Sequence, residues 1–199
     1  MSARDHTCDP AVVFRSLGGL LSELRAVDHA VYAAVAVTRT PALDVPIRRL
    51  STAADYSRLW FAIAGLLALV GGRTGRRAAL SGAASIGVTS AAVNLGLKAV
   101  GRRRPDREQH GVPTGRHVRM PTSTSFPSGH SAAGFAFANA VSAEVPSLAL
   151  PLHLLAFFVA YSRVHTGVHY PSDTIAGGIV GGAVGQTVAS LTRHRQRRR

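Results

Sequence analysis

The sequence predicts an all-α fold, a multi-pass membrane helical bundle of about four to six membrane helices with an N-terminal interfacial amphipathic region. Two observations support this fold class. The 199-residue chain carries a formal net charge of +13, yet 46% of its residues are apolar. The charges are clustered, whereas the apolar residues come in long blocks. A soluble nucleic-acid-binding protein this basic would be more polar, so a nucleic-acid partner is not expected.

The first predicted region, residues 1–57, is an amphipathic or interfacial segment. It mixes Glu23, Arg25 and Asp28 into an apolar pattern and is interrupted by Pro41 and Pro46. Charges spaced in this way fit a helix that lies in the membrane interface better than one that crosses the bilayer.

Residues 58–192 form the predicted membrane domain, because its apolar stretches carry no Asp, Glu, Lys or Arg. A crossing helix needs roughly 20 apolar residues, which residues 78–97 and 174–192 supply. The stretch 59–72 is short, and it spans if Arg58 and Arg73 extend to the headgroups. The alternative for each is a helix of a soluble core. The stretches are residues 59–72, 78–97, 145–162 and 174–192, with a fifth over 131–143.

Charge placement predicts the orientation of these helices. Arginines at 73, 76 and 77 mark a cytoplasmic turn, and the basic tail, residues 193–199, falls on the same side and is expected to be disordered. The loops 98–128 and 162–173 then share the opposite face. The sequence thus predicts a multi-pass protein of the cell membrane with its site on the extracytoplasmic face.

Small residues in the last stretch indicate close helix packing. Gly177, Gly181 and Gly185 recur every four residues, a spacing that lets helix backbones approach one another in lipid.

The external loop is rich in arginine, against the usual bias of that face. So many cations indicate an anionic ligand. They are Arg102, Arg103, Arg104, Arg107, Arg116 and Arg119.

The first chemical motif is "KAVGRRRP", Lys98 to Pro105. Lys98 is the only lysine among 23 Lys and Arg residues. Arginine binds phosphate through a bidentate fork and lysine through a point charge, so both Lys98 and Arg104 are candidate phosphate ligands. The alternative is an ordinary basic helix end at a headgroup surface.

The second motif is "FPSGH", which opens the 131–143 stretch. Ser128 is a candidate N-cap and Gly129 allows close approach of the backbone. The free N–H groups of a helix start bind anions, and His130 in the first turn can act there as acid or base. An ordinary surface helix start is the alternative.

The third motif is "SRVHTGVHYPSD", residues 162–173. His165, His169 and Asp173 fall four residues apart, as zinc ligands on one helix face would. Gly167 and Pro171 argue against a continuous helix. In the other interpretation Arg163 contacts an anion, His169 is a nucleophile and Asp173 orients its ring.

Together these motifs resemble those of the type 2 phosphatidic acid phosphatase superfamily of membrane phosphatases. That family's pattern is Lys-x6-Arg-Pro, then Pro-Ser-Gly-His, then Ser-Arg-x5-His-x3-Asp. The second and third stand here without deviation, and the resemblance covers roughly residues 58–192. The first is one residue short between Lys98 and Arg104. Either the helix unwinds before Pro105, or Arg102 or Arg103 replaces Lys98.

The resemblance implies a metal-independent lipid phosphatase that needs no cofactor. His169 would attack the phosphorus atom, Asp173 would position His169, and His130 would act as acid and then as base. The phosphate ligands would be Lys98, Arg104, Ser128, Gly129 and Arg163.

The implied substrate is a membrane lipid phosphate. An isoprenoid phosphate or diphosphate comes first, a phosphatidate-like lipid second, and a polyprenyl-phosphate sugar for cell-wall assembly is a further option. Vanadate-dependent haloperoxidases share the pocket chemistry, but they are soluble and larger. Two other classes stay open: a non-catalytic lipid-binding scaffold, and a metal-dependent hydrolase that uses His165, His169 and Asp173.

Overall fold

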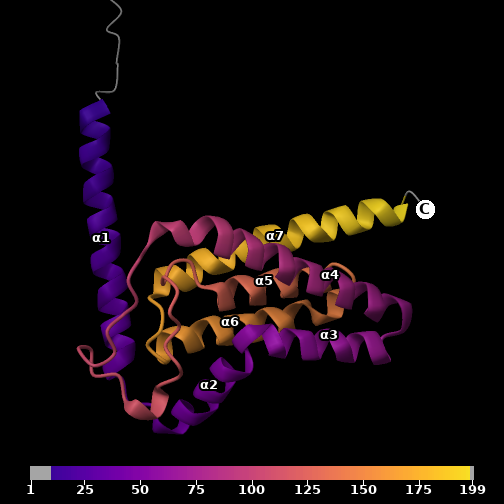
Figure 1. The fold of residues 1–199 in the computed structure, drawn as a ribbon, viewed down its shortest axis with the longest axis horizontal. Coiled ribbons are helices and arrows are strands. Elements are labelled where there is room, and N and C mark those ends of the chain that lie inside the picture. The colour runs from indigo at the N-terminus through magenta and orange to yellow at the C-terminus, as the bar shows by residue number, and fades with distance from the viewer. Residues whose placement is uncertain (1–9, 198–199) are drawn as a thin grey trace, which may run out of the picture.

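The computed structural model describes residues 10–197 and contains no strand within them (Figure 1). Seven α-helices are joined by short helical turns and one long loop between α4 and α5. The helices are α1 (Pro10–Val37), α2 (Pro41–Ala53), α3 (Arg58–Val70), α4 (Gly72–Ala91), α5 (Gly129–Ser142), α6 (Ala149–His165) and α7 (Pro171–Arg197).

Helix α5 lies at the centre of a bundle made by α3 to α7 (Figure 1). Its small residues are buried, and its Phe137 ring packs 5.4 Å from the Trp60 ring of α3 in the main apolar core. Helix α1 crosses one end of this bundle and contacts α6 and α7. In the described part of the predicted interfacial region, α1 and α2 therefore both pack against helices of the bundle.

Three described helical segments are long and apolar enough to cross a membrane: Gly72–Ala99, Pro146–His165 and Pro171–His194. Helix α2 and the segment Asp55–Val70, bent by 63°, make a fourth if they form one span. Large apolar side chains such as Leu69, Leu80 and Ile179 are exposed on the outside of the bundle, as a lipid environment allows. The all-helical membrane fold predicted from the sequence is confirmed.

Glycines of α7 let it press against α5, as predicted. A Cβ atom at Gly181 would come 2.0 Å from the Ala132 carbonyl oxygen. A Cβ at Gly177 would lie 2.4 Å from the carbonyl oxygen of Ser128, and one at Gly185 equally close to that of Ala136. The backbones are thus in contact over two helical turns, which fixes the register of α7 against the start of α5.

The C-terminal boundary differs from the sequence prediction. Helix α7 continues to Arg197, so the segment expected to be a disordered tail is helical up to that residue. Arginine and glutamine are good helix formers, and cations are favourable at a helix C-terminus. Beyond α4, the chain continues as a π-helical turn (Ala92–Gly96) and a 3-10 turn (Leu97–Val100). This helical segment ends at Gly101, well before Pro105.

The packing of α7 on α5 predicts that Gly181→Ala destabilises the protein by about 1–3 kcal/mol, because the new methyl group would overlap a backbone carbonyl. Gly182→Ala is the matched control, since a Cβ there meets only the Asn139 amide at 3.4 Å. The midpoint of thermal unfolding in detergent, followed by circular dichroism, measures both. Equal midpoints for the two variants would contradict this packing.

Candidate active site

The three motifs meet at the end of the bundle that α1 crosses (Figure 1). Helices α5, α6 and α7 run in alternating directions with short connections, so the start of α5 and the α6–α7 link share that end. The Ser128 N–H donates a hydrogen bond to the Asp173 carbonyl oxygen at 2.9 Å. The second and third motifs, which lie more than thirty residues apart, are therefore directly joined.

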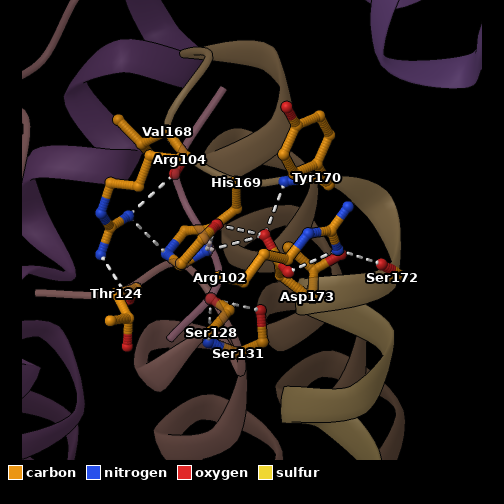
Figure 2. A network of polar contacts seen from close by, with 12 residues as sticks. Arg102, Arg104, Thr124, Ser128, Ser131, Val168, His169, Tyr170, Ser172 and Asp173 are labelled. Carbon is orange, nitrogen blue, oxygen red and sulfur yellow. Dashed lines mark hydrogen bonds and ion pairs between the residues drawn. The ribbon is translucent and has the colours of Figure 1, made fainter. Parts of the chain in front are cut away.

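His169 lies in the link between α6 and α7, and its side chain is only 3% exposed. Its Nε2 is 3.2 Å from an Arg104 guanidinium nitrogen (Figure 2). Because a guanidinium only donates hydrogen bonds, Nε2 must carry the lone pair and Nδ1 the proton. Nδ1 lies 3.5 Å from the Asp173 carboxylate. The acceptor nitrogen of the ring thus points toward the Arg104 guanidinium, and its N–H points toward the Asp173 carboxylate.

Burial is the main influence on the protonation of His169. It lowers the pKa of the imidazole to about 3, helped by Arg104 and Arg163 and only partly offset by Asp173. The ring is therefore neutral at physiological pH, which is the form in which a histidine nitrogen can act as a nucleophile.

Asp173 is fully buried and held by several donors (Figure 2). The Ser125 hydroxyl and the Tyr170 N–H donate to one carboxylate oxygen, the latter at 2.8 Å. Arg102 donates to the other at 2.9 Å. These donors fix the carboxylate beside the His169 ring. Ser125 was not among the predicted site residues, although the run of hydroxyl residues before the second motif could have indicated it.

Lys98 and Arg104 converge on one hydroxyl in spite of their short spacing. The Lys98 ammonium donates to Ser123 Oγ at 2.8 Å, and Arg104 approaches the same atom at 3.3 Å. The unwinding between Ala92 and Gly101 makes this geometry accessible. Of the two explanations for the short spacing, the structure therefore supports an unwound helix before Pro105. Arg102 points instead to Asp173.

The second motif forms a helix start, as predicted. Ser128 is the N-cap of α5, and its hydroxyl accepts from the Ser131 N–H at 3.4 Å. The space beside Gly129 is open, since a Cβ there would meet no atom within 4 Å. An anion could therefore approach this backbone closely.

His130 pairs with an acidic residue that the sequence analysis missed. Its Nε2 is 2.9 Å from a carboxylate oxygen of Asp55, in the turn between α2 and α3. Burial and the nearby Arg163 guanidinium lower the pKa of His130, and the Asp55 carboxylate orients the ring and offsets part of this shift by favouring the protonated form. No spacing pattern in the sequence links these positions, which are 75 residues apart.

Arg163 is 1% exposed and lies next to the same carboxylate. One guanidinium nitrogen donates to the Ser51 hydroxyl at 2.7 Å and is 3.7 Å from Asp55. Its Nε is buried without a hydrogen-bond partner among the described residues. A buried donor of this kind is suited to an anion that completes its bonding.

His165 does not join His169 and Asp173. Its Nε2 lies 3.0 Å from a carboxylate oxygen of Asp44, which also accepts from Arg116. Helix α6 ends at His165 and Gly167 has φ +72°, so the two histidines point to different neighbours. In the described residues no group of three His, Cys, Asp or Glu side chains is arranged to hold a metal ion.

The arginines of the long loop do not all serve a ligand, which corrects the expectation from the sequence. Arg116 is completely buried and donates to backbone carbonyls at the α1–α2 turn, including that of Val35 at 3.0 Å. Arg107 donates to the Val118 carbonyl at 2.9 Å. Arg116 therefore fastens the loop to the α1–α2 region, whereas Arg107 joins two parts of the loop itself.

A cavity of about 430 Å³ opens beside His130. Arg58 and Arg119 stand at its exposed rim, while Asp55 and Ser123 line it together with His130. The cavity therefore joins the acidic partner of His130 to the hydroxyl that Lys98 and Arg104 share.

Comparisons with known proteins identify a family and several related phosphatases. The PAP2 superfamily matches residues 78–197. The decaprenylphosphoryl-5-phosphoribose phosphatase of Mycobacterium tuberculosis is 34% identical over 164 residues, which cover 82% of this chain and 89% of that protein. The lipid A 1-phosphatase of Rhizobium etli is 38% identical over 94 residues, 45% of this chain and 39% of that protein.

Two crystal structures have a similar fold. Aquifex aeolicus LpxE matches with a TM-score of 0.62 and 22% identity, over 81% of this chain and 93% of that one. The transmembrane PAP2 type phosphatidylglycerolphosphate phosphatase of Bacillus subtilis matches with a TM-score of 0.63 and 20% identity, over 88% and 87%. The chain therefore belongs to the PAP2 superfamily, as a membrane-embedded phosphatase built of helices.

Proposed function

We propose that the protein is a metal-independent lipid phosphate phosphatase that works through a phosphohistidine on His169. The observation that carries this proposal is the orientation of the His169 ring. Its Nε2 lone pair faces Arg104, and its Nδ1–H faces Asp173. A nitrogen nucleophile held among cations is suited to attack a phosphate ester, whose negative oxygens those cations attract.

In the first step His169 Nε2 forms a bond to phosphorus, and the bond from phosphorus to the ester oxygen breaks. The leaving oxygen takes the bonding electron pair, and a proton from His130 neutralises it. Asp173 stabilises the positive charge that develops on the imidazole. Asp55, at 2.9 Å from His130, favours the protonated ring that this step needs.

In the second step His130 removes a proton from water, and the water oxygen attacks phosphorus. The nitrogen–phosphorus bond breaks, its electron pair returns to Nε2, and inorganic phosphate leaves. His130 thus acts as an acid in the first step and as a base in the second, as microscopic reversibility requires.

The phosphoryl oxygens would be held by Lys98, Arg104 and Arg163, with the Ser128 hydroxyl and the Gly129 N–H at the start of α5. Charge accumulates on these oxygens in phosphoryl transfer, and fixed cations stabilise it without reorganisation. These groups supply the charge that a metal ion provides in other phosphatases, so we propose no metal or other cofactor.

The proposed substrate is an isoprenoid-linked phosphate, for example a polyprenyl-phosphate sugar with a terminal phosphomonoester. The name of the mycobacterial relative, which covers most of this chain, supports this class. Arg58 and Arg119 at the cavity rim match a substrate with a second negative charge outside the reacting group. We also propose that the site faces the extracytoplasmic side, because Arg73, Arg76 and Arg77 cluster at the opposite end.

Replacement of the nucleophile tests this proposal. We expect His169→Ala to abolish phosphate release, by a factor of about 10³ or more, and wild-type activity to persist in a strong chelator. His165→Ala is the control, because His165 contacts Asp44 rather than the site, and it should keep much of the activity. Purified protein in detergent is assayed with a panel of isoprenoid, phosphatidate-like and sugar-linked lipid phosphates.

A similar loss in both variants, or loss of wild-type activity in chelator, would favour a metal site formed by both histidines. Absence of activity on every lipid phosphate would favour a lipid-binding scaffold.

The low pKa of His169 also predicts an effect of pH on stability. The unfolded histidine takes up a proton below about pH 6.5, whereas the folded one stays neutral to about pH 3. The unfolded state therefore binds more protons in this range, and folding stability falls as the pH falls, by on the order of 1 kcal/mol per pH unit. His169→Gln should reduce this slope in thermal unfolding between pH 7 and pH 5. Parallel slopes would contradict a neutral, buried ring.

A further inference from the structure

We propose that Asp28 of helix α1 is a positioning residue for the site, which acts through Arg102 on Asp173. The inference rests on the proposed function and adds to it a residue outside all three motifs. It gives helix α1, which lies outside the bundle, a role in the reaction.

Arg102 links two carboxylates directly. One guanidinium nitrogen is 2.5 Å from Asp28 Oδ2, and another is 2.9 Å from Asp173 Oδ1. The guanidinium also lies over the Tyr170 ring, 4.1 Å from its centroid, which fixes its plane. Asp28 is only 7% exposed, in a helix whose described residues are mostly exposed. The ion pair between Arg102 and Asp28 is therefore fixed in position, unlike a mobile ion pair on the surface.

Asp28 also caps helix α7 from outside. The Ser172 N–H donates to Asp28 Oδ1 at 2.8 Å, and the Ser172 hydroxyl donates to Oδ2 at 2.7 Å. Ser172 is in the first turn of α7, where free N–H groups favour a negative partner. Asp173 is the next residue, so the Asp28 carboxylate fixes the turn from which Asp173 reaches His169.

The charges explain how this connection would affect the reaction. Asp28 and Asp173 carry two negative charges and Arg102 one positive charge, which leaves a net charge of −1 beside His169. This ring becomes positive when phosphorus bonds to Nε2. Loss of the Asp28 charge would leave Arg102 uncompensated, 2.9 Å from the carboxylate that stabilises the new cation. The penalty arises in the transition state, so it should lower kcat more than it changes KM.

Asp28→Asn tests the inference, because the amide keeps the shape and an acceptor for Ser172 but loses the charge. We expect kcat to fall about tenfold, with KM changed by less than about twofold. Glu23→Gln is the matched control: it removes the same charge from an exposed position of the same helix, and should leave kcat unchanged. Circular dichroism in detergent verifies that each variant is folded.

A double-mutant cycle separates positioning from simple anchoring of α1. If Asp28 acts through Arg102, Asp28→Asn should have little further effect on kcat in an Arg102→Gln background. Should Asp28→Asn not fold, Arg102→Lys gives a second test, because lysine keeps the charge but cannot bridge both carboxylates. It should lower kcat with KM retained.

Wild-type kcat in folded Asp28→Asn, or an equal loss in the Arg102→Gln background, would overturn the inference while His169-dependent turnover stands. Absence of His169-dependent turnover in the wild-type protein would overturn the proposed function, and this inference with it.

Discussion

The site depends on one buried imidazole held between opposite charges. His169 is excluded from water, its Nε2 faces the Arg104 guanidinium, and its Nδ1–H faces Asp173. Burial keeps the ring neutral, and the positive charges near Nε2 further disfavour a proton on that nitrogen. The same cations that hold the ring in this form would attract the oxygens of a phosphate, so nucleophile and substrate are brought together by one set of charges.

The rest of the fold serves to keep this arrangement in place. The glycines of α7 set its register on α5, and this register joins Ser128 to the backbone of Asp173. The unwound end of the α4 segment brings Lys98 and Arg104 to the shared hydroxyl of Ser123. Helix α1 contributes Asp28, helix α2 contributes Ser51, and the turn after α2 contributes Asp55, so the N-terminal region completes the polar surroundings of the site.

Sequence patterns predicted the parts of this protein that depend on local physics. Uncharged blocks marked the helices, the Ser128 N-cap marked the start of α5, and Gly167 with Pro171 marked the break after α6. Partners from distant segments were not predictable, because no periodicity relates Asp55 to His130 or Asp28 to Arg102. The role of Arg116 was misjudged for the same reason, since only the folded α1–α2 turn shows the carbonyls that it binds.

Direct detection of the covalent intermediate is the sharpest test of this account. The protein is mixed briefly with a lipid phosphate that is radiolabelled in its phosphoryl group, quenched in alkali, digested and mapped by mass spectrometry. We expect label on His169, stable in alkali and lost in acid, as for a phosphorus–nitrogen bond. If the protein hydrolyses the substrate but carries no label on His169, or carries the label on another residue, the mechanism is contradicted.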